Sequence, residues 1–233
     1  MPISTIAFDA DDTLWVNEEF FRLTEERFHA LLADHVDIKD ISPNLLETEK
    51  RNLRYYGYGI KGFTLSMIET AIEVTGGKVT ATTLQEILHA GRDMFEHPAT
   101  PYESVKETLS DLSRDYRLLL VTKGDLFDQE RKLAQSGLGD FFDGIEIVSE
   151  KDTAAYLRIF DQYGDGPARS LMVGNSMKSD ILPAIAAGAY GVFIPSKITW
   201  AMEEAAPPEG HDRFHQLSNI DQLPELIRQI TCP

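Results

Sequence analysis

Short runs of apolar residues alternate with longer helical patterns along much of this 233-residue chain. The runs predict buried strands, because strands covered on both faces carry few polar residues. They cover residues 3–8, 117–121, 144–148, 170–173 and 191–194. Helical patterns, with apolar residues three or four positions apart and glycines near several ends, separate these strands. They cover residues 102–113, 125–137, 153–162, 179–187 and 223–230.

This alternation predicts the fold class. A strand, a helix and a further parallel strand form a crossover unit in which the helix covers one face of the sheet. We therefore expect an α/β fold with a Rossmann-like, doubly wound parallel sheet and helices on both faces. In such sheets, ligands bind beyond the carboxyl ends of the strands.

The pattern differs between residues 18 and 96, where helical spacing prevails and no convincing strand is found. Further helices are predicted there at residues 45–55, 65–74 and 83–94. We predict that this helical block is inserted after the first strand. The chain then divides into an α/β core domain of residues 1–16 and 97–233 and an all-helical domain of residues 17–96.

Composition and charge narrow the class of protein. With 42% hydrophobic and 26% charged residues, the chain has the composition of an ordinary globular protein. Its net charge of −16 argues against nucleic acid or an anionic membrane as the main partner, although a local cation can still bind a small anionic substrate. Cys232 is the single cysteine, so neither a disulfide framework nor a cysteine metal site is expected. No signal peptide or membrane span is recognised, and we expect a cytoplasmic protein.

Three carboxylates and a threonine directly follow the first predicted strand: Asp9, Asp11, Asp12 and Thr13. Side chains two residues apart on an extended segment point the same way, so Asp9 and Asp11 are expected on one side of the strand end. Two like charges so close are hard to keep ionised together. Either a bound cation or one protonated carboxyl is expected, and both indicate catalysis. The alternative is a polar turn in which Asp12 or Thr13 caps a helix.

Polar groups also follow three other predicted strands. They are Thr122, Lys123 and Gly124 after the second strand, Lys151 after the third, and Asn175, Ser176 and Asp180 after the fourth. In a parallel sheet all of these groups meet at one edge. Each also has a simpler explanation when taken singly. These are a strand–helix turn at Thr122, a solvated helix start at Lys151, helix caps at Asn175 and Ser176, and a first-turn acid at Asp180.

The combined set suits phosphoryl transfer through a covalent intermediate. Asp9 is the candidate nucleophile, and Asp11 is the candidate acid that protonates the leaving oxygen and later takes a proton from water. Mg²⁺ prefers hard oxygen ligands, which Asp9, the Asp11 backbone carbonyl and Asp180 can provide. Lys151 adds positive charge next to the nucleophile and the phosphate.

Thr122 and the backbone amides of Lys123 and Gly124, at a helix N-terminus, can bind the remaining phosphate oxygens. The stretch of residues 55–63 is rich in aromatic residues and glycine, and we expect it to be a loop. Arg54 and Lys61, in and next to this loop, are candidates to contact a second anionic group of a substrate.

These residues resemble the motifs of the haloacid dehalogenase-like hydrolase superfamily, most of whose members are phosphatases. Asp9-x-Asp11-x-Thr13 matches the first motif in full, Thr122 the second and Lys151 the third, and residues 174–180 resemble the fourth. The inserted block looks like the alpha-helical cap of this superfamily. The resemblance implies a Mg²⁺-dependent phosphatase that acts on a small phosphorylated metabolite through an aspartyl phosphate, with a cap that closes over the substrate.

One position departs from the pattern: Asn175 stands where the superfamily most often has aspartate. An asparagine can offer an oxygen to Mg²⁺ or to a coordinated water, but it brings no charge. We expect weaker metal binding or altered geometry, with Asp180 carrying more of the binding.

Three other functions remain open. A phosphotransferase or mutase would use the same residues to pass the phosphoryl group to a sugar. Carbon–halogen hydrolysis is disfavoured by Asp11, because that chemistry typically lacks the second aspartate and the metal. A catalytically weak protein that binds a phosphorylated ligand is favoured only by Asn175. The oligomeric state, monomer or homodimer, is also left open.

Overall fold

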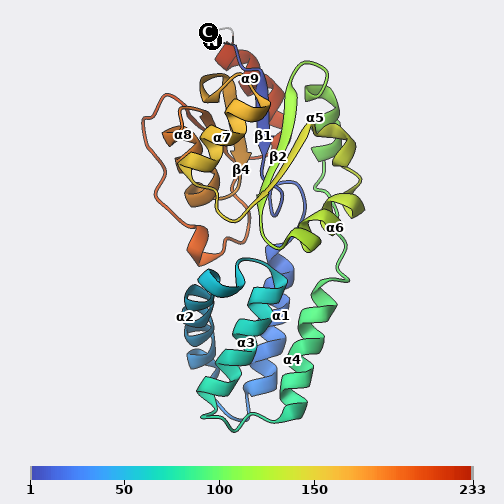
Figure 1. Ribbon diagram of the computed structural model, residues 1–233, viewed down its shortest axis with the longest axis vertical. Helices are drawn as coiled ribbons and strands as arrows, with labels where there is room; N and C mark the ends of the chain where they lie inside the picture. The colour runs from blue at the N-terminus through green and yellow to red at the C-terminus, as the bar shows by residue number, and fades with distance from the viewer. Residues whose placement is uncertain (1, 232–233) are drawn as a thin grey trace. The chain divides into compact units, whose positions relative to one another are not determined.

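The computed structural model describes residues 2–231, so Cys232 lies outside the described residues. The chain divides into two compact units (Figure 1). The first consists of Met1–Glu18, Ala99–Lys123 and Arg131–Pro233, and the second of Glu19–Pro98 and Gly124–Glu130. The stretch Gly124–Glu130 groups with the helical second unit, where Asp125 pairs with Lys61. The sequence carries no pattern that indicates this grouping.

The first unit is built on a six-stranded parallel sheet with the strand order β3-β2-β1-β4-β5-β6. The strands are β1 Thr5–Phe8, β2 Arg117–Lys123, β3 Gly144–Val148, β4 Ser170–Gly174, β5 Tyr190–Phe193 and β6 Phe214–Gln216. This confirms the predicted α/β fold class and the five predicted strands. Strand β6 was not predicted, because a three-residue edge strand leaves too short a pattern to recognise.

Helices cover both faces of this sheet. They are α5 Val105–Leu112, the part of α6 Leu126–Ser136 that belongs to this unit from Arg131 on, α7 Thr153–Tyr163, α8 Leu182–Ala186 and α9 Leu223–Thr231. Two of the predicted helices need correction. Helix α5 begins at Val105, not at 102, because Ser104 has a left-handed backbone (φ 69°) that a helix cannot include. The predicted helix at 179–187 is a π-helical turn, Met177–Ile181, followed by the short α8.

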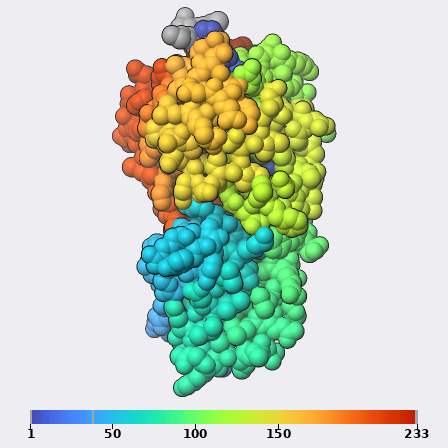
Figure 2. All heavy atoms as spheres, viewed as in Figure 1, coloured from blue at the N-terminus to red at the C-terminus, as the bar shows by residue number. Residues whose placement is uncertain are grey.

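Alternate strand residues supply two separate apolar clusters. Ile6 and Phe8 of β1 join one cluster with residues of α5 and α9, while Ala7 joins the other with residues of α7 and α8. In Figure 2, the yellow and orange atoms of α7 and its neighbours form much of the near surface of the first unit. Fully burying a large apolar side chain stabilises a fold by about 1.5–3 kcal/mol. The two-sided cover therefore fixes the sheet whose carboxyl edge carries the predicted site.

The second unit contains the helices α1 Glu18–Leu32, α2 Ile38–Tyr56, α3 Ile60–Val74 and α4 Ala81–Met94, of which α1 begins one residue before the unit. They enclose a core of their own around Phe28, Leu45, Met67 and Ile87. No strand occurs in the described part of this unit, residues 19–98 and 124–130.

The expected loop at 55–63 is wrong for most of its length, because only Gly57–Gly59 connects α2 to α3. Gly57 closes α2 in a positive-φ conformation, its N–H donating to the Leu53 carbonyl, and Gly62 continues α3. Of the glycines that suggested a loop, Gly57 therefore ends a helix and Gly62 lies within one.

Within residues 2–231, no helix has both the length and the apolar character needed to cross a membrane.

Candidate active site

The chain turns sharply just after β1, and this turn places its carboxylates at the carboxyl edge of the sheet. The Asp9 N–H donates to the Val173 carbonyl at 2.9 Å, which continues the pairing of β1 with β4 by one residue. The amides of Thr13 and Leu14 then return to the Ala10 carbonyl. This turn brings the Thr13 hydroxyl to 2.8 Å from Asp9 Oδ2, to which it donates. Asp9 is thus buried and held by its own turn.

Lys151 lies between Asp9 and Asp180. Its Nζ donates to Asp9 Oδ1 and, at 2.7 Å, to Asp180 Oδ1. Only 2% of the Lys151 side chain and 1% of the Asp180 side chain are exposed. Residues 142 and 29 positions apart in the chain therefore meet in one buried ion triad, as the parallel sheet predicts.

The charges of this triad are coupled. Burial, and to a lesser extent Asp9, raise the pKa of Asp180, while Lys151 opposes the shift. Burial also disfavours charged Lys151, but the two carboxylates outweigh burial, and the pKa of Lys151 lies above its usual value. Lys151 is therefore the charged centre of the triad, and a bound cation would oppose the raised pKa of Asp180 and favour its ionised form.

Asn175 lies beside the first turn. Its backbone N–H donates to Thr13 Oγ1 at 3.1 Å. One end of its side-chain amide lies 3.2 Å from both the Asp11 carbonyl oxygen and Asp9 Oδ2. With the NH₂ group turned to that end, Asn175 donates to both oxygens. With its own oxygen there, Asn175 accepts from the Thr13 hydroxyl at 3.1 Å, and a cation bound among these oxygens would offset their mutual repulsion.

These oxygens are the kind of ligand that Mg²⁺ binds, but together they carry little negative charge. Mg²⁺ binds through one or two carboxylates and keeps several waters, and this edge offers Asp9, Asp180, the Asn175 amide and the Asp11 carbonyl. No group of three or more His, Cys, Asp or Glu side chains arranged to hold a metal is found among residues 2–231. The donor set is therefore poorer in charge than a carboxylate cluster, in keeping with asparagine at position 175.

Asp11 and Asp12 have separate surroundings. Both Asp11 oxygens accept from Lys132 Nζ at 2.7 Å. Asp12 accepts from the backbone N–H groups of Asn17 and Glu18 and so caps α1, which agrees with the capping alternative for this residue alone. Burial, outweighing these two hydrogen bonds, raises the pKa of Asp12 to about 7.

Lys132 was missed by the sequence analysis, because a lysine in a helical pattern reads as a solvated surface residue. Its position one to two turns after the start of the helix that follows Thr122 is the signal that could have indicated it.

The end of β2 carries Thr122, which is buried, and Lys123. Lys123 Nζ donates to Ser179 Oγ at 2.9 Å and pairs with Glu203, which also accepts from the Ser176 hydroxyl. Burial opposes the charge of Glu203, but Lys123 and the hydroxyls of Ser176 and Ser179 together outweigh burial, and the pKa of Glu203 lies below its usual value. Glu203 is a second residue that the sequence analysis missed, since it lies on an irregular stretch after β5.

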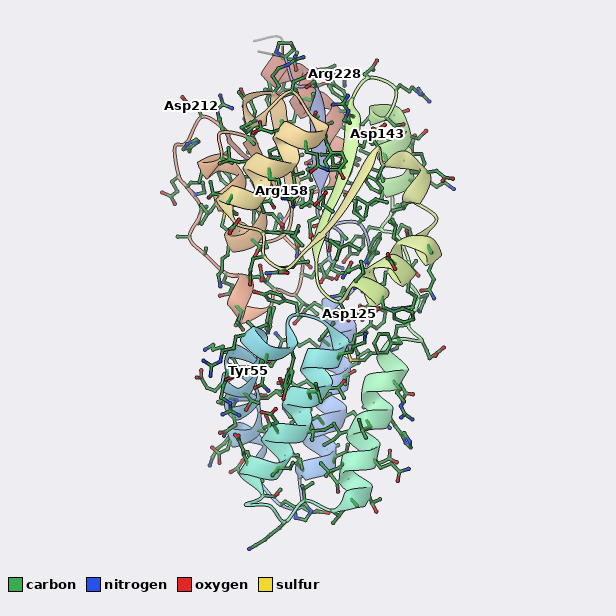
Figure 3. All side chains as sticks on the ribbon, in the orientation of Figure 1. Tyr55, Asp125, Asp143, Arg158, Asp212 and Arg228 are labelled. Carbon is green, nitrogen blue, oxygen red and sulfur yellow. The ribbon has the colours of Figure 1, made fainter. Side chains whose placement is uncertain are left out.

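The remaining predicted residues lie in the second unit. Gly124 has φ +139°, and an added Cβ would lie 3.1 Å from the Gln129 side chain, so the turn requires glycine. Lys61 pairs with Asp125, labelled in Figure 3, at 2.9 Å, and Arg54 stacks on Tyr55 at 4.6 Å. Substrate contacts by Arg54, Lys61 and Gly124 stay predictions.

Comparison with known proteins identifies the family of this chain. The family model of haloacid dehalogenase-like hydrolases matches residues 3–188. Glyceraldehyde 3-phosphate phosphatase of Methanothermobacter thermautotrophicus is 34% identical over 54% of this chain and 58% of its own length. N-acylneuraminate-9-phosphatase of Rattus norvegicus is 24% identical over 99% of this chain and 96% of its own.

Solved structures agree as well. A haloacid dehalogenase-like family hydrolase from Xanthomonas campestris is 39% identical with a TM-score of 0.88, over 98% of this chain and 92% of that chain. The putative hydrolase YfnB from Bacillus subtilis, bound to magnesium, has a TM-score of 0.66 at 17% identity, over 97% and 99% of the two chains, and shows the fold alone. The match of the family model over most of the chain, on a sheet with buried Asp9, Lys151 and Asp180, assigns this protein to the haloacid dehalogenase-like hydrolases.

Proposed function

We propose that this enzyme is a Mg²⁺-dependent phosphatase that hydrolyses a small phosphomonoester through an aspartyl phosphate on Asp9. The observation that carries the proposal is the buried contact of Asp9 with Lys151 beside Asp180. A carboxylate beside an ammonium group, at the carboxyl edge of a parallel sheet, suits attack on phosphorus. Curated relatives named as phosphatases of glyceraldehyde 3-phosphate and of N-acylneuraminate 9-phosphate support this substrate class.

The first step forms the phosphoenzyme. An Asp9 oxygen bonds to phosphorus while the bond from phosphorus to the alcohol oxygen breaks. Asp11 gives its proton to that oxygen, so the alcohol leaves neutral. Lys151 reaches two acceptors in the described structure, and an ammonium has three donors, so one N–H can serve the phosphate together with Thr122.

The second step releases phosphate. Water attacks the phosphorus, Asp11 takes the proton of the water, and the bond to Asp9 breaks, which regenerates the enzyme. Asp9, Asp180, Asn175 and the Asp11 carbonyl would hold Mg²⁺, which when bound supplies positive charge against the repulsion between carboxylates and phosphate.

The test is phosphate release from a panel of phosphorylated metabolites, including the two named substrates of the curated relatives. Release with Mg²⁺ that is lost with EDTA is the expected result. Asp9→Asn keeps the shape of the side chain but removes the nucleophile, and no phosphate release above background is expected. Release by Asp9→Asn at the wild-type rate would refute the assignment of Asp9. A wild-type protein inactive on the whole panel would count against a phosphatase.

Asn175 favours a second candidate, a protein that binds a phosphorylated ligand and turns it over poorly. This alternative predicts a rise in melting temperature with a phosphorylated metabolite and Mg²⁺ but no phosphate release. Asn175→Asp separates the two candidates. A large gain in turnover would indicate that asparagine limits metal binding, while an unchanged rate would mean that four oxygen donors of low charge suffice.

A further inference from the structure

Lys132 is a buried lysine outside the motifs that carry the proposed chemistry. It lies on α6 with 8% of its side chain exposed. Its Nζ lies 2.7 Å from Oδ1 and 2.7 Å from Oδ2 of Asp11, and it donates to Asn17 Oδ1 at 3.1 Å. A buried ammonium is costly unless charged and polar partners surround it, and here Asp11 provides the opposite charge.

Counting donors separates the role of Lys132 from that of Lys151. An ammonium group has three N–H donors, and among the contacts that the structure describes Lys132 donates to two oxygens of Asp11 and one of Asn17. In the described structure Lys151 reaches one oxygen each of Asp9 and Asp180. Lys151 therefore has a donor to offer a substrate, whereas Lys132 directs its donors to the protein.

Asp11 is also held from a second direction. The indole N–H of Trp15 donates to Asp11 Oδ1 at 2.7 Å. Trp15 is fully buried, and its carbonyl accepts from the Asp12 N–H at 2.8 Å, so the ring is fixed by the core and by the same turn. A carboxylate held by an ammonium and an indole has one favoured orientation, which is the requirement for efficient proton transfer.

We propose that Lys132 is a positioning residue that holds the Asp11 carboxylate in the orientation from which Asp11 exchanges protons with the leaving oxygen and with water. The proposal rests on the proposed function for its kinetic consequence, but not for the contact itself. The proton passes from Asp11 to the leaving oxygen when the bond to phosphorus breaks, and from water to Asp11 when the phosphoenzyme is hydrolysed.

The consequence depends on the leaving group. A p-nitrophenolate leaves without a proton, whereas an alkoxide needs one. Loss of Lys132 should therefore slow phosphoenzyme formation from an alkyl phosphate more than from p-nitrophenyl phosphate. A purely structural role would slow both equally.

The kinetic experiment uses Lys132→Met, the conservative variant Lys132→Arg, and Lys106→Met as a matched control on an exposed part of α5. Phosphoenzyme formation is measured by acid quench under single-turnover conditions with Mg²⁺. For an alkyl phosphate, the rate in Lys132→Met should fall about 10- to 100-fold with KM nearly unchanged. Lys132→Arg should recover most of it, because a guanidinium also pairs with both carboxylate oxygens.

Equal losses for the two leaving groups, or an unchanged rate in Lys132→Met, would overturn the proposal. A structural measurement decides the contact without activity: crystal structures of wild type and Lys132→Met should differ in the Asp11 side-chain orientation. An Asp11 carboxylate that stays in place without Lys132 would also overturn it. Wild type that releases no phosphate would refute the proposed function but leave this structural comparison decisive.

Discussion

At the scale of single residues, each carboxylate of the candidate site pairs with a particular lysine, and this pairing sets its electrostatic environment. Asp9 and Asp180 share Lys151, whereas Asp11 pairs with Lys132. Two separate pairings divide the negative charge that the closely spaced aspartates bring to one strand end. Asp9, Lys151 and Asp180 were expected to converge, because each directly follows a strand or begins a helix there. The partner of Asp11 could not be predicted, because Lys132 is 121 residues away on a helix face.

Replacing Lys151 by Met is predicted to destabilise the protein when no metal is present. Asp9 and Asp180 would be left in a buried site without their cation, and removing one partner of a buried ion pair typically costs about 3–5 kcal/mol. Urea unfolding in EDTA should show a loss of this size, and Mg²⁺ should restore part of it. Asp180→Asn removes one of the two carboxylates and should lower the free energy of unfolding by less than Lys151→Met does. A Lys151→Met protein as stable as wild type in EDTA would show that the triad contributes little.

At the scale of elements, the strand ends position the chemistry. Most strands were predicted within one or two residues because burial on both faces leaves a continuous apolar signal. Helix starts were harder to predict, as at α5, because they depend on the backbone conformation of one residue, Ser104. The π-helical turn that carries Asp180 was not predicted either, since a single wide turn leaves the apolar spacing almost unchanged.

The end of β4 requires glycine at position 174. A Cβ at Gly174 would lie 2.2 Å from Asp180 Oδ2, so Gly174→Ala must displace the Asp180 side chain. We predict weaker Mg²⁺ binding and about 10- to 100-fold lower activity, measured by titrating activity with Mg²⁺. Gly139→Ala is the control, because its Cβ would meet nothing closer than 3.9 Å. Unchanged Mg²⁺ dependence in Gly174→Ala would argue against a metal-binding role for Asp180.

Strand β6 carries a histidine that should make stability depend on pH. Burial lowers the pKa of His215, whose Nε2 is buried and has no hydrogen-bond partner in the described structure. The unfolded chain then binds the proton more readily, so this contribution to stability is present above about pH 6.5 and is lost as pH falls through the lowered pKa. His215→Asn should flatten this part of the pH dependence in urea unfolding between about pH 7 and 5. An unchanged slope of stability against pH in His215→Asn would mean that other groups cause this pH dependence.

The whole molecule has the fold of its family and a strongly acidic composition. The family model, the parallel sheet and the Xanthomonas campestris structure agree on the fold class that the alternation of strands and helices predicts. The net charge of −16 belongs to the whole chain, and the local charge at the site differs because Lys151 and Lys132 lie among the carboxylates. A small anion must nevertheless approach an acidic protein.

Salt should therefore help the substrate to bind. At about 0.1 M salt the screening length is about 10 Å, so added NaCl weakens long-range repulsion of an anionic substrate more than contacts in the buried site. We predict that kcat/KM for a phosphomonoester rises between about 10 and 150 mM NaCl at constant Mg²⁺. A steady fall over this range would indicate that the local field at the substrate entrance is positive.

The sequence by itself determined the sheet class and the strand-end groups Asp9, Lys151 and Asp180, because burial pattern and position after a strand are local properties. Only the tertiary structure decided which charges pair. Lys132 on Asp11 and Glu203 on Lys123 and Ser176 join distant segments through the packing of α6 and of the stretch after β5. The physical reason is that a charged residue has the same sequence signature whether it faces water or a buried partner.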